Sequence, residues 1–492
     1  MALGCNRFLK YSAGLVIVLA CVLFTPCDAR YRRSHRYGAQ LKSDVEEQWF
    51  IQKLDHFNGA DTRVWKQRYF VNDTFYRPGG PVFLMIGGEG PANPAWMQYG
   101  TWQLYAQKLG ALCLLLEHRF YGKSHPTEDL STANLRFLSS RQALADLAHF
   151  RTVTAESRGL TNSKWVAFGG SYPGSLAAWF RLKYPQLVHA SVATSAPVHA
   201  TVNFPEYLEV VWRSLAAENP ECPLLVKKAS DTLVERLKDP KTYDNITKDF
   251  RLCSKPQIQS ETDSAYLLES LAENFMDVVQ YNEDNRAFEV CEGAVGTNIT
   301  IKVLCSVMLD SSLGEPYDRY AAVVRLMLNT FSQPCLNTQY KSYIQDMSNT
   351  SWSGPEAGGG RQWVYQTCTE FGFYQSTDSP NQPFSGFPLP YYLKQCADIY
   401  NLSTSLDEVV QQTNEEYGGY DIKSTRIVFP NGSIDPWHAL GVTQDITSDL
   451  PAVFIKGTAH CANMYPARAE DLPQLGLARD HIFILLQKWL AE

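Results

Sequence analysis

Short apolar runs alternate with amphipathic stretches over the first two hundred residues of the chain. Four such runs lie at residues 81–86, 111–117, 164–168 and 190–194. Short apolar runs separated by helical patterns, such as the one at 139–154, are typical of the buried parallel strands of an α/β fold. Ser139 and Gln142 are spaced as a capping box for this helix. Residues 47–76 alternate apolar and polar side chains, which predicts antiparallel strands at the edge of the sheet.

The strand pattern stops near residue 200 and returns with apolar runs at 425–429 and 452–455. Between these limits the chain has helical periodicity, as at 231–238 and 265–281, and loops rich in Gly and Pro. We therefore expect a large, mostly helical insertion between strands of one sheet. The predicted division is a core of residues 47–200 and 425–492 and a cap of residues 201–424.

The N-terminus has the pattern of a secretory signal. Arg7 and Lys10 precede an apolar run at 13–24, and small residues suited to cleavage follow at 27–29. Twelve apolar positions are too few to span a bilayer, which needs about twenty. We expect residues 1–29 to be removed and the protein to enter the secretory pathway, with secretion and a lysosomal destination both open. The basic segment 30–46 is either a short pro-segment or a disordered tail.

Charge and composition argue against several classes of partner. A net charge of −7, with no basic block in the body of the chain, argues against nucleic acid. No later run is long and apolar enough for a transmembrane helix, so no stable membrane span is expected. The cysteine spacings contain no C-x-x-C, and we predict neither a metal nor a cofactor. The oligomeric state stays open, with a homodimer among the alternatives.

Nine cysteines remain after removal of the signal. Cys113 lies inside an apolar run and is expected to be a buried thiol. The other eight can form four disulfides that brace the cap, but the sequence does not choose among the pairings. These eight are Cys222, Cys253, Cys291, Cys305, Cys335, Cys368, Cys396 and Cys461.

A serine stands at a sharp turn between the run 164–168 and an amphipathic stretch at 176–184. The turn reads Gly169-Gly170-Ser171-Tyr172-Pro173-Gly174. Hydrolases present a nucleophilic serine in this way, and the backbone N–H of Tyr172 would then face the oxygen of an attacked carbonyl. Pro173 stands where Gly-x-Ser-x-Gly has its second glycine, but proline is tolerated in the first turn of a helix.

Two further residues follow in the order that this fold requires, serine, then acid, then histidine. Asp435 lies in the loop after the run 425–429, and His460 lies after the run 452–455. The alternatives are an ordinary Asp-Pro turn and a loop histidine. His438 shares the loop of the acid, so it is not the expected base. Loops at the carboxyl ends of parallel strands line one crevice, which favours a Ser171–His460–Asp435 triad.

Several segments resemble one family of serine peptidases. They are residues 54–57, 117–124, 169–172, 363–372 and 435–437. The chain is similar to the family that contains lysosomal Pro-X carboxypeptidase, dipeptidyl peptidase II and thymus-specific serine protease, and residues 174–179 bring it nearest to the last of these. The resemblance implies that Ser171 is the nucleophile, Asp435 the acid and His460 the base. It also implies cleavage of peptides after proline.

The remaining site residues are inferred from their places in the predicted fold. Gly88, after the third core strand, is the candidate for the second oxyanion donor beside Tyr172. Glu89 would meet a substrate amine or bond locally. Three cap residues would form an aromatic pocket wall or pack in the cap: Trp363, Tyr365 and Gln366. Six Asn-x-Ser/Thr triplets are candidate glycosylation sites: Asn72, Asn245, Asn298, Asn349, Asn401 and Asn431.

The predicted protein is thus an α/β-hydrolase with a helical, disulfide-braced cap. We expect a serine peptidase, an exopeptidase that cuts after proline or a small apolar residue through an acyl-enzyme. An esterase or lipase would use the same triad. A catalytically idle binding protein on this scaffold would normally have lost a triad residue, and the chain retains all three.

Overall fold

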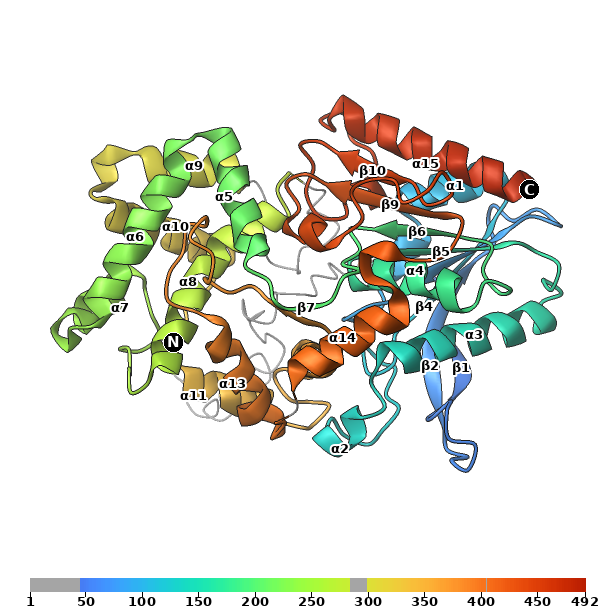
Figure 1. The fold of residues 1–492 in the computed structure, drawn as a ribbon, viewed down its shortest axis with the longest axis horizontal. Helices are drawn as coiled ribbons and strands as arrows, with labels where there is room; N and C mark the ends of the chain where they lie inside the picture. The colour runs from blue at the N-terminus through green and yellow to red at the C-terminus, as the bar shows by residue number, and fades with distance from the viewer. Residues whose placement is uncertain (1–44, 284–298, 404) are drawn as a thin grey trace, which may run out of the picture.

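A computed structural model describes residues 45–283, 299–403 and 405–492. Its centre is one eight-stranded sheet with the strand order β1-β2-β4-β3-β5-β6-β9-β10 (Figure 1). The strands are β1 Gln48–Lys53, β2 Val64–Asn72, β3 Val82–Ile86, β4 Leu112–Leu116, β5 Trp165–Gly170, β6 Ala190–Thr194, β9 Ile427–Gly432 and β10 Ala452–Ile455. β1 and β2 run antiparallel at one edge, and the six strands from β4 to β10 are parallel. The predicted α/β fold is confirmed.

The apolar runs become central strands because both of their faces are covered. Every residue of β3, β4, β5 and β6 is buried. Helices α3 (Ser140–Ser157) and α4 (Tyr172–Lys183) cover one face, and α1 (Thr101–Leu109) and α15 (Pro473–Ala491) cover the other (Figure 1). The alternating segment 47–76 forms the edge pair β1 and β2, as its pattern predicts.

The capping box at α3 is only half formed. The Ser139 hydroxyl accepts a hydrogen bond from the Gln142 N–H at 3.2 Å, as an N-cap should. The Gln142 side chain does not return to Ser139. It donates to Asp55 Oδ1 at 2.7 Å and accepts from the His56 N–H at 3.1 Å. A tertiary contact to the loop after β1 therefore replaces the local one that the spacing predicts.

Helices dominate the chain between β6 and β9. They are α5 Glu206–Glu218, α6 Glu221–Leu237, α7 Tyr243–Asp249, α8 Glu261–Gln280, α9 Ile301–Leu309, α10 Pro316–Thr330, α11 Tyr340–Met347, α12 Gly360–Gln366, α13 Leu389–Tyr400 and α14 Leu406–Tyr417. Two short parallel strands, β7 (Thr201–Asn203) and β8 (Gly372–Tyr374), pair beside them. Most of these helices lie to one side of the sheet as a cap, and α14 returns toward α4 (Figure 1).

Among the described residues, three of the four possible disulfides are present, and they brace the cap. The bonds join Cys222 to Cys305, Cys253 to Cys335, and Cys368 to Cys396. Cys113 and Cys461 are buried thiols outside these bonds. Cys461 packs against the turn that carries Ser171. Cys291 lies outside the described residues.

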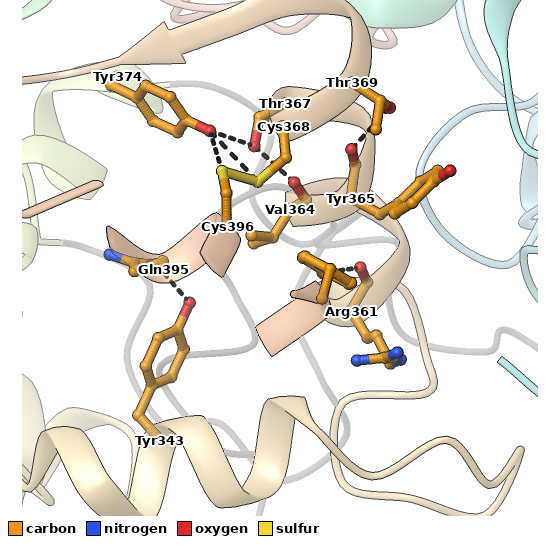
Figure 2. The surroundings of a disulfide bond; sticks show 11 residues. Tyr343, Arg361, Val364, Tyr365, Thr367, Cys368, Thr369, Tyr374, Gln395 and Cys396 are labelled. Carbon is orange, nitrogen blue, oxygen red and sulfur yellow. Dashed lines mark hydrogen bonds between the residues drawn. A yellow bond between two sulfur atoms is a disulfide. The ribbon is translucent and has the colours of Figure 1, made fainter. Parts of the chain in front are cut away.

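The Cys368–Cys396 bond ties α13 to the short π-helical turn after α12 (Figure 2). The Tyr374 hydroxyl lies 3.1 Å from Cys396 Sγ and 3.5 Å from Cys368 Sγ, so the end of β8 joins the same cluster. In the part of the chain that the structure describes, no helix is long and apolar enough to cross a membrane. The predicted signal, residues 1–29, lies outside that part, as does nearly all of segment 30–46.

Candidate active site

Ser171 occupies the turn that joins β5 to α4. β5 ends at Gly170, α4 begins at Tyr172, and Ser171 between them has φ 64° and ψ −134°. A non-glycine residue in this region stores about 1–3 kcal/mol of strain, and such strain is typical of a nucleophile held out at a strand-to-helix turn. The Ser171 N–H donates to the Thr194 carbonyl at the end of β6, at 3.0 Å. Pro173 lies in the first turn of α4, where its missing N–H is not needed.

Asp435 and His460 form a buried ion pair. Asp435 follows β9 and His460 follows β10, and Asp435 Oδ2 lies 2.9 Å from His460 Nδ1. Asp435 Oδ1 accepts a hydrogen bond from the Trp437 N–H at 3.0 Å, which fixes the carboxylate plane. Both side chains are almost fully buried. A carboxylate on Nδ1 keeps the proton there and leaves Nε2 as the basic nitrogen.

The pKa of His460 lies well above its usual value of 6.5. Burial alone would lower this pKa, because it disfavours the charged ring. The negative charge of Asp435 and the adjacent Cys461 outweigh that effect and raise it. An imidazole whose cation is stabilised in this way is a stronger proton acceptor.

The loop of His460 contacts the turn of Ser171 directly. A Cβ built on Gly170 would lie 2.8 Å from Cys461 Sγ. The Cys461 N–H donates to Ser195 Oγ, and Asn463 Nδ2 donates to Thr194 Oγ1, both at 3.0 Å. Since Ser171 is also bonded to Thr194, the end of β6 anchors both loops.

A cap helix holds the acid and histidine loops together, and the sequence analysis missed it. The Gln280 carbonyl, at the end of α8, accepts from the His460 N–H at 2.9 Å. The Gln280 side chain Oε1 accepts from the Tyr207 hydroxyl at 2.7 Å and from Trp437 Nε1 at 2.9 Å. Tyr281 packs edge-on against the His460 ring. These contacts cross from cap to core, so no local pattern reveals them.

The loop after β3 lies against the first turn of α4. A Cβ on Gly88 would lie 2.8 Å from Pro173 Cδ and closer still to Cγ. Only a glycine therefore lets this loop approach the helix that begins at Tyr172. The N–H of Tyr172, as the first residue of that helix, has no partner within the helix. Gly88 therefore lies against the first turn of the helix that follows Ser171.

A cavity of about 1140 Å³, measured with its open mouth, lies between core and cap and is lined by Ser171. The core also contributes Tyr172 and Trp437, and α8 contributes Gln280 and Tyr281. Behind its cap wall lies the disulfide of Figure 2, whose neighbours Val364, Thr367, Tyr374 and Gln395 face the cavity. Asp435 and His460 do not border the cavity; they lie behind its surface.

The predicted substrate residues divide into two groups. Glu89 and Trp363 line the cavity. Tyr365 does not, and its ring packs edge-on against Tyr400. Gln366 does not line it either: its amide accepts from the Tyr121 hydroxyl at 2.6 Å and donates to the Tyr172 hydroxyl at 3.1 Å. Gln366 therefore holds the side chain of Tyr172 in place. For both residues the packing alternative, rather than the pocket wall, describes their surroundings.

Two further polar side chains lie near the site, Glu89 and His438. Burial raises the pKa of Glu89 to about 8, so this carboxyl is largely protonated at neutral pH. His438, which the sequence analysis set aside, points its Nδ1 at the Asp435 backbone carbonyl, 2.7 Å away, and not at the carboxylate.

The glycosylation candidates have different accessibilities. Asn245, Asn349 and Asn401 are exposed. Asn72 is partly buried and its amide donates to the Met97 carbonyl. Asn431 is buried and its Nδ2, the atom that would carry a glycan, donates to the Val442 carbonyl at 2.9 Å. A glycan on Asn431 is thus incompatible with the folded state. Asn298 lies outside the described residues.

Comparison with known proteins identifies the family of the chain. The family described as Peptidase_S28, serine carboxypeptidase S28, matches residues 52–482. Thymus-specific serine protease of Mus musculus is 40% identical over 461 residues, which cover 90% of this chain and 87% of that protein. Lysosomal Pro-X carboxypeptidase of Homo sapiens is 29% identical over 458 residues, which cover 90% and 88%.

Solved structures align more loosely. The peroxisomal α/β-hydrolase Lpx1 of Saccharomyces cerevisiae covers 90% of this chain and 90% of its own, with 12% identity and a TM-score of 0.36. The fold assignment therefore depends on the strand order of the chain itself. On the match over residues 52–482, the chain belongs to the serine carboxypeptidase S28 family and is a serine-type exopeptidase.

Proposed function

We propose that Ser171, His460 and Asp435 form the catalytic triad of this peptidase. His460 Nε2 accepts the proton of Ser171 Oγ while Oγ attacks the carbonyl carbon of the peptide bond. Asp435 keeps the Nδ1 proton in place and stabilises the imidazolium. The imidazolium then protonates the leaving amine, and water repeats the sequence to release the acyl group.

The oxyanion of the tetrahedral intermediate would be held by the backbone N–H groups of Tyr172 and Gly88. The places of Tyr172 and Gly88 in the fold support this assignment. Tyr172 begins a helix immediately after the nucleophile, so its N–H has the favourable end of the helix dipole behind it. Gly88 lies against Pro173 of the same helix. Two N–H groups from a turn and a neighbouring loop are the usual source of such a site in this fold.

The residue before the cut bond would lie against aromatic side chains. Tyr172, Trp363 and Trp437 border the cavity that Ser171 lines. Flat apolar rings suit the ring of proline, and a related protein is named a Pro-X carboxypeptidase. We therefore assign cleavage after proline or a small apolar residue. The cap above the cavity limits access to chain ends, and the disulfides fit a protein that matures in the secretory pathway.

The observation that carries this proposal is the buried Asp435–His460 pair at 2.9 Å, on a loop in contact with the strained turn of Ser171. Its test is digestion of a peptide library by the purified protein, with products identified by mass. Wild type should release short units from chain ends after proline or a small apolar residue, and Ser171→Ala should release none. Equal product formation by the two proteins would rule the triad out.

A further inference from the structure

The side chain of Tyr172 is held at its far end, away from the backbone. The residue is 1% exposed, and its hydroxyl lies 3.1 Å from two buried nitrogens, Nε2 of His118 and Nε2 of Gln366. His118 belongs to segment 117–124, which follows β4 in the core, and Gln366 belongs to segment 363–372 in the cap. Both segments resemble the peptidase family, and the proposed triad uses neither. A core segment and a cap segment therefore meet on the residue next to the nucleophile.

Each hydrogen bond in this cluster has a defined direction. His118 Nδ1 lies 2.7 Å from the Arg119 carbonyl, which can only accept, so Nδ1 carries the proton of the neutral ring. Burial lowers the pKa of His118 to about 4, so the ring is neutral at neutral pH. Its Nε2 therefore accepts from the Tyr172 hydroxyl, while the Gln366 amide donates to the same hydroxyl oxygen. The Tyr121 hydroxyl donates to Gln366 Oε1 at 2.6 Å and fixes the orientation of that amide.

Three rings pack around the Tyr172 ring. The centroids of His118, Trp363 and Phe371 lie 5.5, 5.7 and 5.5 Å from its centroid. All three rings are tilted against it, an arrangement that aromatic pairs favour. Packing around the ring and hydrogen bonds at the hydroxyl together give the side chain of Tyr172 one position.

The first turn of α4 has few hydrogen bonds of its own. Pro173 lacks an N–H, and the N–H of Tyr172 has no partner within the helix. The Ser171 carbonyl accepts from the N–H groups of Gly174 and Ser175, at 2.8 and 3.1 Å. A side chain that is fixed at its hydroxyl also restrains the backbone of Tyr172. This restraint matters because a binding group in an active site must stay within about 0.5 Å of its productive place.

We infer that His118 and Gln366 are positioning residues for the reaction: through the Tyr172 hydroxyl they hold the Tyr172 N–H toward the oxyanion. This inference rests on the proposed triad and oxyanion site. Loss of the hydrogen bonds should leave substrate binding intact, because the Tyr172 ring still borders the cavity. It should slow the step in which negative charge develops on the carbonyl oxygen.

The variant Tyr172→Phe removes the hydroxyl and keeps the ring. We expect kcat for the best substrate of the peptide-library digest to fall about tenfold or more, because a displaced oxyanion donor loses part of the 10²–10³ that a whole donor supplies. KM should stay within about twofold of wild type. Tyr243→Phe is the matched control, since it removes a buried hydroxyl bonded to the Leu237 carbonyl at 3.1 Å on α7, and it should keep kcat. An unchanged kcat in Tyr172→Phe would overturn the inference.

Two substitutions of His118 test its role as the acceptor. His118→Phe removes the acceptor and should lower kcat as much as Tyr172→Phe does. His118→Gln supplies an amide oxygen near the place of Nε2 and should keep kcat within about threefold of wild type. If His118→Gln is as slow as Tyr172→Phe, the role of His118 is contradicted, and this comparison holds even where His118→Phe does not fold.

The double variant Tyr172→Phe/His118→Phe shows whether the two residues act through one hydrogen bond. It should be no slower than Tyr172→Phe alone, since both changes remove the same bond. Additive losses would show that His118 acts on the reaction by another route, and would overturn the inference.

A peptide aldehyde separates oxyanion binding from ordinary binding. It carries the residues that precede the cut bond of the same substrate. Ser171 Oγ adds to its carbon and gives up its proton to His460, and the aldehyde oxygen becomes the oxyanion. In Tyr172→Phe the Ki of this aldehyde should rise by the factor by which kcat/KM falls. The Ki of the matching alcohol, which cannot form the adduct, should not change, and an equal rise for both compounds would overturn the inference.

The variant His460→Ala in the same assays separates the two claims. If His460→Ala cleaves the substrate at the wild-type rate, the triad itself is refuted. If His460→Ala is inactive and Tyr172→Phe has the kcat of wild type, only the inference about the positioning residues is refuted.

Discussion

At the scale of single residues, the proposed chemistry depends on a buried Asp435–His460 pair and on the turn that carries Ser171. Asp435 uses one oxygen to accept from the Trp437 N–H and the other to face His460. The strained backbone of Ser171 holds its side chain at the tip of the turn. The orientation of each group is therefore set by backbone and by its neighbour, before any substrate arrives.

Replacing Asp435 by asparagine should keep the fold and remove the charge. In serine proteases of other folds this change lowers kcat by about 10⁴, because the imidazole takes the wrong tautomer. We expect a loss of similar size here.

In wild type, kcat/KM should rise with pH through a pKa above 6.5, since His460 acts as a base when it is neutral and Asp435 raises the pKa of His460. In Asp435→Asn the same limb should move to lower pH. A pH–rate profile of both proteins measures this, and an unmoved limb would contradict the pairing.

The loop of Gly88 offers a second prediction. In Gly88→Ala the new Cβ would collide with the ring of Pro173, so the loop must withdraw from the helix. Loss of one oxyanion donor lowers kcat by about 10²–10³, and we expect a loss in that range. Gly59→Ala, where a Cβ meets no atom within 4 Å, is the control and should be as active as wild type.

The double variant Gly88→Ala/Pro173→Ala tests whether the collision with Pro173 causes the loss of kcat. It removes the ring atoms that the new Cβ would meet and should recover part of the lost kcat. No recovery would show that the Gly88 loop acts in another way.

Some of the residue assignments could be predicted from local pattern and others could not. Ser171, Asp435 and His460 each follow a strand, as expected, because apolar runs are visible in the sequence. For Gln366 a pocket wall and packing in the cap were both open, and its amide is bonded to Tyr121 and Tyr172, which are distant in the chain. Burial of the Asn431 amide is likewise a tertiary effect.

At the scale of elements, helix α8 connects the cap to the reaction centre. Its last residue, Gln280, bonds to the His460 loop through its backbone and to Trp437, beside Asp435, through its side chain. The same helix carries Glu269 and Glu273, which line the cavity. One helix therefore positions the acid and histidine loops and borders the space for the substrate.

Gln280→Ala should lower both the stability of the protein and its turnover. It leaves two buried donors, the Tyr207 hydroxyl and Trp437 Nε1, without their acceptor. Each such group costs about 1–3 kcal/mol, so we expect the free energy of unfolding to fall by at least that amount and kcat to fall with it. Chemical denaturation and turnover measure the two effects. Gln411→Ala, on the exposed face of α14, should change neither; an equal loss in both variants would contradict the role of Gln280.

Two strand boundaries followed directly from the apolar runs. The strands β6 and β10 begin and end at the residues that their apolar runs predict, 190–194 and 452–455. At α3 the predicted capping box gave way to a contact with the loop after β1, because Gln142 finds a partner in Asp55. Local rules describe what an isolated segment prefers, and tertiary partners can offer a better bond.

At the scale of the whole molecule, the cap and the sheet are stabilised by different means. The core strands are buried on both faces, whereas the cap adds three disulfides to its helical packing. The sequence could show that a helical insertion was present. It could not show the pairings, because they depend on how helices distant in sequence meet, and the predicted cap limits, residues 201–424, stay a prediction.

Loop length predicts the relative effect of the disulfides. Cys253 and Cys335 are 82 residues apart, and Cys368 and Cys396 are 28 apart. The chain-entropy relation gives about 4.5 and about 3.6 kcal/mol for these two loops. Replacing both cysteines of a pair by alanine should therefore lower the thermal midpoint in both cases, and more for the longer loop. Scanning calorimetry measures this, and an unchanged midpoint in the Cys253→Ala/Cys335→Ala protein would contradict a bracing role.

The central claim is that Ser171 is a nucleophile activated by His460. Labelling with a fluorophosphonate, followed by mass mapping of the modified residue, tests it most directly. The account predicts one modified position, Ser171, in wild type; a labelling rate lower by at least about 10³ in His460→Ala; and no label in Ser171→Ala. A label on another residue, or an undiminished rate in His460→Ala, would contradict it.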